Sequence, residues 1–81
     1  MKLTADIYVT ATTVQLQALK SCFEAEKEAM QTPRSSVAIH STKDTIHFAV
    51  TSKDSTALRA TLNTITKLVT VFEKAVEEKN E

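Results

Sequence analysis

The segment from Asp54 to Glu78 carries two apolar stripes at helical spacing, and this feature constrains the fold more than any other. In each stripe the side chains recur at steps of three and four, which is the pattern of one face of an α-helix. The first stripe consists of Leu58, Leu62, Ile65, Val69, Phe72 and Val76. The second consists of Ala57, Thr61, Thr64, Leu68, Val71 and Ala75. One stripe can face the core of an 81-residue chain, so we expect part of the second to contact a partner.

Three short segments alternate apolar and polar side chains, which is typical of half-buried β-strands. They cover residues 2–10, 37–40 and 45–51. The last two are joined by a short polar connection, which predicts a hairpin with a four-residue loop. In that register Ile39 faces Phe48, so the apolar faces of the two strands agree. The third segment is the most apolar of the three, and we expect it to form the central strand.

Two helices complete the predicted set of elements. Thr12 and Gln15 have the spacing of a capping box, which predicts that a helix begins there. This helix runs to about Met30 and ends before Pro33, because proline cannot continue the backbone hydrogen bonds. The last helix begins at Asp54 or Ser55 and continues to about Glu78. Together these elements predict one α+β domain over residues 1–81, a two-layer fold with a three-stranded antiparallel sheet and both helices on one face, in the order strand, helix, strand, strand, helix.

Composition excludes several classes of function. The formal net charge is +0, and Arg34, Lys43 and Lys53 are scattered along the sequence, which argues against an independent nucleic-acid binder. The chain has no glycine, so it lacks the phosphate-binding loops and the dinucleotide fingerprint, which need that residue. No apolar run approaches the roughly 20 residues that span a bilayer, and no signal peptide is visible. With a single cysteine, these features predict a cytoplasmic protein without a membrane partner.

Few residues suggest chemistry of their own. His40 and His47 face each other in the predicted register and could bind a metal or sense pH, but no suitable third ligand is nearby. Cys22 has no adjacent base, so we interpret it as a small core residue at a contact between helices. We therefore expect no catalytic residue, no cofactor and no metal, and we predict that the protein is not an enzyme. A zinc assay on the purified protein would test the alternative of a small metal-dependent enzyme that uses His40 and His47.

The surface of the last helix is the better candidate for a binding site. Arg59 and Asn63 lie one turn apart and share a face, which is either solvated or a polar anchor at the edge of an interface. The first helix also has a stripe of small side chains, made of Val14, Ala18, Cys22, Ala25 and Ala29. We expect the small stripes to pack the two helices together in part, while Thr61, Thr64, Leu68 and Val71 leave apolar surface outside. A partner's helices could complete a bundle there.

The segment from Ser55 to Asn63, following the strand at residues 45–51, resembles the small dimerisation subunit of the KEOPS complex, whose domain is shared with a cancer–testis antigen family. The length, the order of elements and the single Pro33 are similar as well, so the resemblance covers nearly the whole chain. The chain differs at Ala60, where that family often has glycine, and after Asn63, where the family commonly has an aromatic-rich helix face. These differences leave open a diverged paralogue in the same complex.

The resemblance implies a scaffold rather than a catalyst. KEOPS forms threonylcarbamoyl-adenosine beside the anticodon of tRNA, and its chemistry belongs to a transferase subunit. The small subunit binds the transferase through its helices, joins a second copy or a paralogue through a sheet edge, and thereby supports tRNA binding. On this basis the expected interface residues are Ala57, Arg59, Asn63, Thr64, Leu68 and Val71. The alternative is a stand-alone RNA-binding α+β module, which salt-sensitive RNA binding by the isolated chain would support.

Overall fold

The computed structural model describes the backbone of residues 1–79 and the side chains of residues 1–75. Val76, the last member of the first apolar stripe, lies outside the described side chains. The elements follow the predicted order strand, helix, strand, strand, helix, and the α+β fold class is confirmed. They are β1 (Leu3–Thr10), α1 (Thr13–Met30), β2 (Ser35–Ser41), β3 (Thr45–Ser52) and α2 (Ser55–Lys79).

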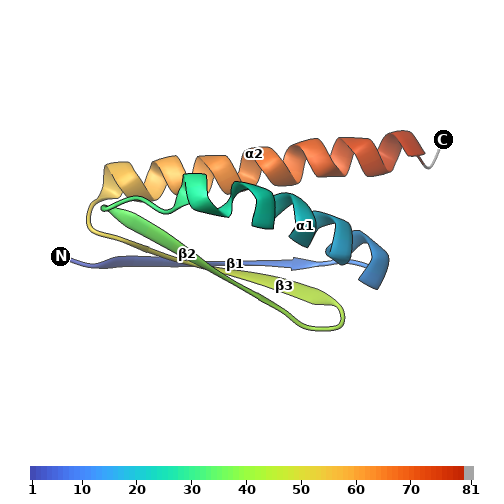
Figure 1. The fold of residues 1–81 in the computed structure, drawn as a ribbon, viewed down its shortest axis with the longest axis horizontal. Coiled ribbons are helices and arrows are strands. Elements are labelled where there is room, and N and C mark those ends of the chain that lie inside the picture. Colours follow the sequence, from blue (N-terminus) through green and yellow to red (C-terminus); the bar gives the residue numbers. More distant parts are fainter. Residues whose placement is uncertain (80–81) are drawn as a thin grey trace.

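The three strands form one antiparallel sheet with β3 in the centre, as its apolar composition predicts (Figure 1). The predicted hairpin register is confirmed, because Ile39 pairs with Phe48 and His40 pairs with His47. The last pair of the hairpin is Ser41–Ile46, and residues 42–44 connect β2 to β3, since Thr45 already belongs to β3 and pairs with Thr10 of β1. Every second side chain of β3 is buried, which shows that one face of the sheet carries the core and the other is open.

Both helices begin at the side chains that the sequence indicates. The Thr12 hydroxyl accepts a hydrogen bond from the N–H of Gln15 at 3.2 Å, and the Gln15 side chain accepts one from the N–H of Thr12 at 3.2 Å. This is a complete capping box. At the start of α2, the Asp54 carboxylate accepts a hydrogen bond from the N–H of Ala57 at 2.8 Å. These bonds satisfy backbone donors that have no partner inside their helix.

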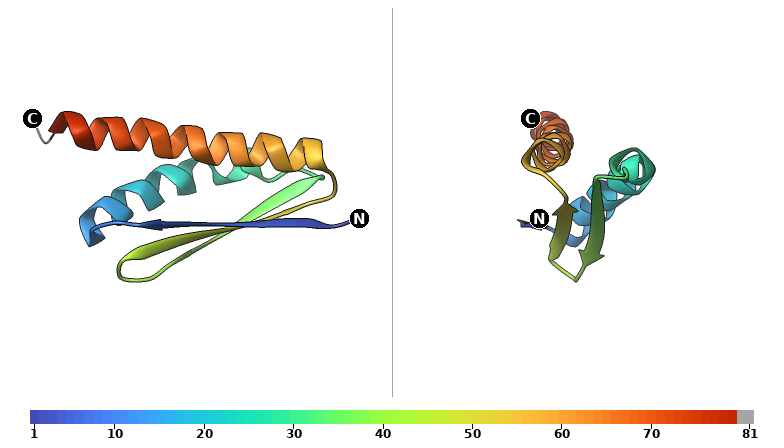
Figure 2. Two further views of the ribbon diagram at one scale, coloured as in Figure 1. Left: turned by 180° about the vertical axis from the view of Figure 1, so that it is seen from behind. Right: turned by 90° about the vertical axis from the view of Figure 1, so that its left-hand side faces the viewer.

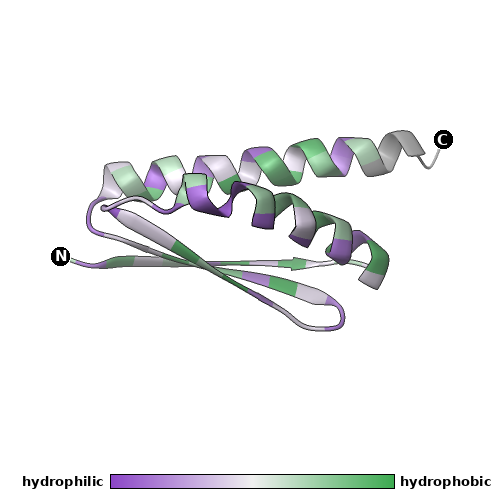
Figure 3. Ribbon diagram, viewed as in Figure 1, coloured by the Kyte–Doolittle hydropathy of each residue, from purple (hydrophilic) through white to green (hydrophobic). Residues whose placement is uncertain are grey.

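The two helices cover one face of the sheet and leave the other face free (Figure 2). Polar and apolar residues intermingle along both helices, because only one side of each helix packs inward (Figure 3). At the centre of the core, Phe23 of α1 meets Phe48 of β3 with ring centroids 4.3 Å apart, and Ile65 of α2 is fully buried. The remaining buried apolar side chains are Leu16, Leu19, Met30, Val37, Ile46 and Val50.

Three expectations about the second stripe of α2 and the small-residue stripe of α1 are wrong. Thr61 is 6 % exposed rather than outside, because its hydroxyl lies 3.0 Å from that of Ser35 in a buried hydrogen bond. Leu68 is half-buried and packs against the core. Cys22 is exposed rather than a core residue, and so are its stripe neighbours Val14, Ala18, Ala25 and Ala29. The small side chains of α1 therefore do not form the predicted contact between the helices.

None of the helices in the described part of the chain is long and apolar enough to cross a membrane.

Candidate partner-binding surface

A groove runs between the end of α1 and the beginning of α2. Its volume is about 240 Å³, and side chains from both helices and the connection between α1 and β2 line it. Small residues predominate on its walls, with Ala29 on α1 and Ala57, Ala60 and Thr64 on α2. Small side chains let the backbone of another helix approach closely. The small side chains therefore leave the backbone of both helices accessible along the groove.

The rotation of α2 determines which of its residues continue this groove. Successive residues of an α-helix are about 100° apart, so Ala57, Thr64, Leu68 and Val71 fall on one flank of α2. Ala57 and Thr64 line the groove, which identifies this as the flank on the side of α1. Val71 is 62 % exposed, although it is a large apolar residue. We call Ala57, Ala60, Thr64, Leu68 and Val71 the groove flank.

Arg59 and Asn63 lie elsewhere on α2. Both are exposed and one turn apart, as the sequence predicts. The helical rotation places Arg59 about 140° from Thr64, on the flank that faces away from α1. Four of the six predicted interface residues therefore lie on the groove flank, while Asn63 and Arg59 lie progressively farther around the helix from it. Arg59 would be reached as well only by a partner that also covers the side of α2 that faces away from the sheet.

The opposite wall of the groove belongs to α1. Ala29 lines the groove, and the same rotation places Ala25, Ala18 and Cys22 on that flank of α1. Val14, at the beginning of this stripe, is 76 % exposed. The groove thus meets the small stripe of α1 at Ala29, and the other members of that stripe continue from it as an exposed flank of α1. Sequence periodicity identifies both stripes, and only their exposure shows that they form a surface.

The open face of the sheet carries a row of rings across all three strands. Tyr8 of β1 stacks on His47 of β3 with centroids 4.4 Å apart and an interplanar angle of 5°. His40 of β2 follows at 5.8 Å from His47. The Nε2 atom of His47 lies 2.7 Å from a carboxylate oxygen of Asp6. No group of three or more histidine, cysteine or acidic side chains is arranged to hold a metal within the residues described.

The basic residues at one end of the sheet are not scattered in space, which corrects the sequence interpretation. Arg34 directly precedes β2, and Lys53 directly follows β3. Because these strands are antiparallel, both residues lie at the same end, where the Lys53 N–H donates to the Arg34 carbonyl at 2.9 Å. The Arg34 guanidinium forms an ion pair with Asp54. The N–H of Ala57 and then this ion pair lower the pKa of the Asp54 carboxyl.

The chain is a small α+β module with an open groove between its two helices. Residues 4–77 match a protein family described as transcription factor Pcc1. The chain belongs to this Pcc1 family, which is the KEOPS subunit family that the segment from Ser55 to Asn63 resembles. No curated protein shows a significant match to the chain.

Proposed function

We propose that this chain is a non-catalytic scaffold subunit of the KEOPS complex that binds the transferase subunit through the groove between α1 and α2. The observation that carries the proposal is the groove itself, open and lined by small residues, in a member of the Pcc1 family. A groove of this kind suits a helix of a partner, because an apolar helix face can complete the two helices into a bundle. Burying Val71 would add affinity, since its side chain is exposed in the free chain.

The proposal includes a second contact through the sheet. Strands β1 and β3 are neighbours, and so are β3 and β2, which leaves β1 and β2 as the two edges. An edge strand presents unpaired N–H and C=O groups that can pair with another chain. Joining a second copy or a paralogue at one of these edges would bridge two transferase subunits. In this role the chain supports threonylcarbamoyl-adenosine modification of tRNA in the cytoplasm without contributing a catalytic group.

The groove contact can be tested with substitutions that leave the core intact. Thr64 and Thr70 are matched sites on α2, because both are exposed and each hydroxyl donates to the carbonyl four residues earlier. They lie about 120° apart around the helix axis, with Thr64 on the groove flank. We expect Thr64→Arg with Val71→Asp to abolish co-purification with the transferase subunit. Thr70→Arg should leave co-purification unchanged.

The place of Arg59 follows from the same assay. Arg59→Glu would weaken the complex only if the partner also covers the side of α2 that faces away from the sheet. This variant is therefore tested separately. Leu68 is avoided as a test site because it packs against the core. Retained binding by the Thr64→Arg and Val71→Asp double variant would contradict the groove as the transferase site.

A second candidate function, a stand-alone RNA-binding module, is favoured by one observation. Tyr8 is 65 % exposed and stacked on His47 on the open face of the sheet, and aromatic rings on a sheet can stack with unpaired bases. RNA binding by the isolated chain that weakens with salt and is lost in Tyr8→Ala would support this function. Absence of RNA binding at low salt would eliminate it.

A further inference from the structure

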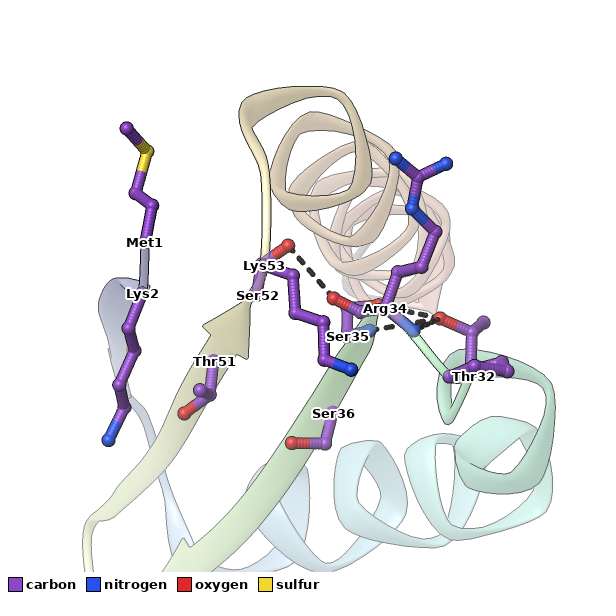
Figure 4. Close-up of a pocket in the computed structure, with 10 residues that line it drawn as sticks. Met1, Lys2, Thr32, Arg34, Ser35, Ser36, Thr51, Ser52 and Lys53 are labelled. Atoms are coloured by element: carbon purple, nitrogen blue, oxygen red, sulfur yellow. Dashed lines mark hydrogen bonds between the residues drawn. The ribbon is translucent and has the colours of Figure 1, made fainter.

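A second hollow, of about 370 Å³, lies at the end of the sheet where β1 begins and β3 ends (Figure 4). The antiparallel topology explains why basic residues gather there. Lys2 precedes β1, Lys53 follows β3 and Arg34 precedes β2, so residues far apart in sequence reach the same end. All three line the hollow, and none of its lining residues in the described part of the chain is acidic.

Hydroxyl groups form the rest of the polar lining, and they divide into two groups. Ser35 and Ser52 are buried and hold the local structure, since Ser52 donates to the carbonyls of Arg34 and Asp54 at 3.2 and 2.9 Å. Ser36 is exposed and Thr51 is half-buried. These last two are paired across β2 and β3, so their side chains leave the same face of the sheet side by side. Their hydroxyls are therefore available to a ligand.

Two of the three positive charges at the hollow have no ion-pair partner among the described residues. Arg34 pairs with Asp54, and its guanidinium points away from the other basic side chain ends (Figure 4). The ammonium groups of Lys2 and Lys53 lie on the same side as the hydroxyls of Ser36 and Thr51 (Figure 4). Neither lysine takes part in an ion pair among the described residues. Two uncompensated positive charges thus border two hydroxyl donors.

We propose that this hollow binds a phosphate group, with Lys2 and Lys53 as charge partners and the hydroxyls of Ser36 and Thr51 as hydrogen-bond donors. A phosphate monoester carries a charge of about −2 at neutral pH, which matches the two lysines, and its oxygens accept several hydrogen bonds. Charge-assisted hydrogen bonds of this type are the stronger ones in proteins. The four proposed ligand residues lie at the end of the sheet and none of them lines the groove, although the two hollows share the wall formed by the connection before β2.

The test uses the full chain and inorganic phosphate as the probe. Backbone amide signals in heteronuclear NMR spectra are followed while phosphate replaces chloride at constant ionic strength. We expect saturable shifts at Ser36, Thr51 and Lys53. The Lys2→Gln and Lys53→Gln double variant should weaken the affinity about tenfold or more. Its control is Lys20→Gln with Lys67→Gln, which makes the same charge change at exposed sites on the helices and should leave the affinity unchanged.

Further arms identify the source of the phosphate and keep the proposal open to refutation. A short single-stranded RNA that shifts the same amides and is displaced by inorganic phosphate would identify a nucleic-acid backbone as the ligand. Saturation by inorganic phosphate or a phosphate monoester alone would identify a small ligand, and either result supports the site. Shifts that do not saturate, or equal weakening by both double variants, would overturn it. Ser36→Ala with Thr51→Val, which keeps the charge, should also weaken binding.

Discussion

The hydroxyl oxygen of Ser35 lies 3.0 Å from that of Thr61, which joins the beginning of β2 to the first half of α2 through a buried hydrogen bond. Thr61 belongs by sequence to the outward stripe of small residues, yet it is 6 % exposed. The Ser35 hydroxyl also lies 3.2 Å from that of Thr32, so a short chain of hydroxyls fixes the connection before β2 against α2. This connection forms one wall of the groove and one wall of the phosphate hollow.

Removing this hydrogen bond should destabilise the chain. Thr61→Val keeps the shape of the side chain and leaves the Ser35 hydroxyl without its α2 partner, so we expect a loss of about 1–2 kcal/mol in the free energy of unfolding. Urea denaturation followed by circular dichroism measures this loss. Thr70→Val, at an exposed position of the same helix, should change stability by less than about 0.5 kcal/mol. Equal effects at the two positions would show that the buried bond makes no net contribution.

The aromatic pair at the centre of the core should dominate stability. Phe23 and Phe48 are fully buried, and Phe23→Ala would leave a cavity between α1 and the sheet. We expect a cost of about 3–5 kcal/mol, a large part of the stability of a domain this small. Thermal unfolding of the variant measures it, with exposed Val14→Ala as the control. A cost below about 1 kcal/mol for Phe23→Ala would mean that the two rings are not packed as described.

Asp54 should make stability depend on pH in the acid range. Hydrogen bonding to the Ala57 N–H, assisted by Arg34, lowers the pKa of Asp54 in the folded chain from its ordinary value of 3.8. The folded state therefore gains stability from the carboxylate above that value and loses it as the pH falls through the lowered pKa. Urea midpoints are recorded from neutral to strongly acidic pH. Below pH 3.8, the ordinary pKa of the carboxyl, the midpoint should fall less steeply with pH in Asp54→Asn than in the natural chain.

Asparagine is the informative replacement at this position, because it can still cap a helix but cannot ionise. Asp54→Ala removes the cap as well and should lower the urea midpoint at every pH. Parallel pH profiles for the natural chain and Asp54→Asn would contradict the role of this carboxyl.

Cys22 offers a probe of the flank of α1 that continues from the groove, because it lies on the same side of α1 as Ala29. It is the only cysteine of the chain, and its exposure on the flank of α1 predicts rapid alkylation in the native state. If the transferase extends from the groove along this flank of α1, alkylation in the complex should slow by about tenfold or more, and mass spectrometry of the modified chain measures the rate. A thiol moved to the other flank of α2, in Cys22→Ser with Thr70→Cys, should stay reactive in the complex. Unchanged reactivity of Cys22 would show that the partner does not cover this flank of α1.

Much of the fold follows from local patterns. The alternation in the strands fixes which side chains face the core, and the agreement of the apolar faces fixes the register that pairs Ile39 with Phe48. The Thr12 capping box determines where α1 begins and Pro33 limits where it ends, because both act on backbone groups a few residues away. The family follows from such features too, because the segment from Ser55 to Asn63 carries the resemblance that the Pcc1 match confirms.

The sequence by itself determined the elements, their order, the pairing of the strands and the existence of surplus stripes on both helices. Only the tertiary structure decided that Thr61 turns inward, that Cys22 stays outside and that Lys2 and Lys53 line one hollow at the end of the sheet. The physical reason is the range of the interactions. Periodicity and capping act within a few residues, whereas the rotation of a helix, and hence the surface it leaves open, depends on how all layers pack together.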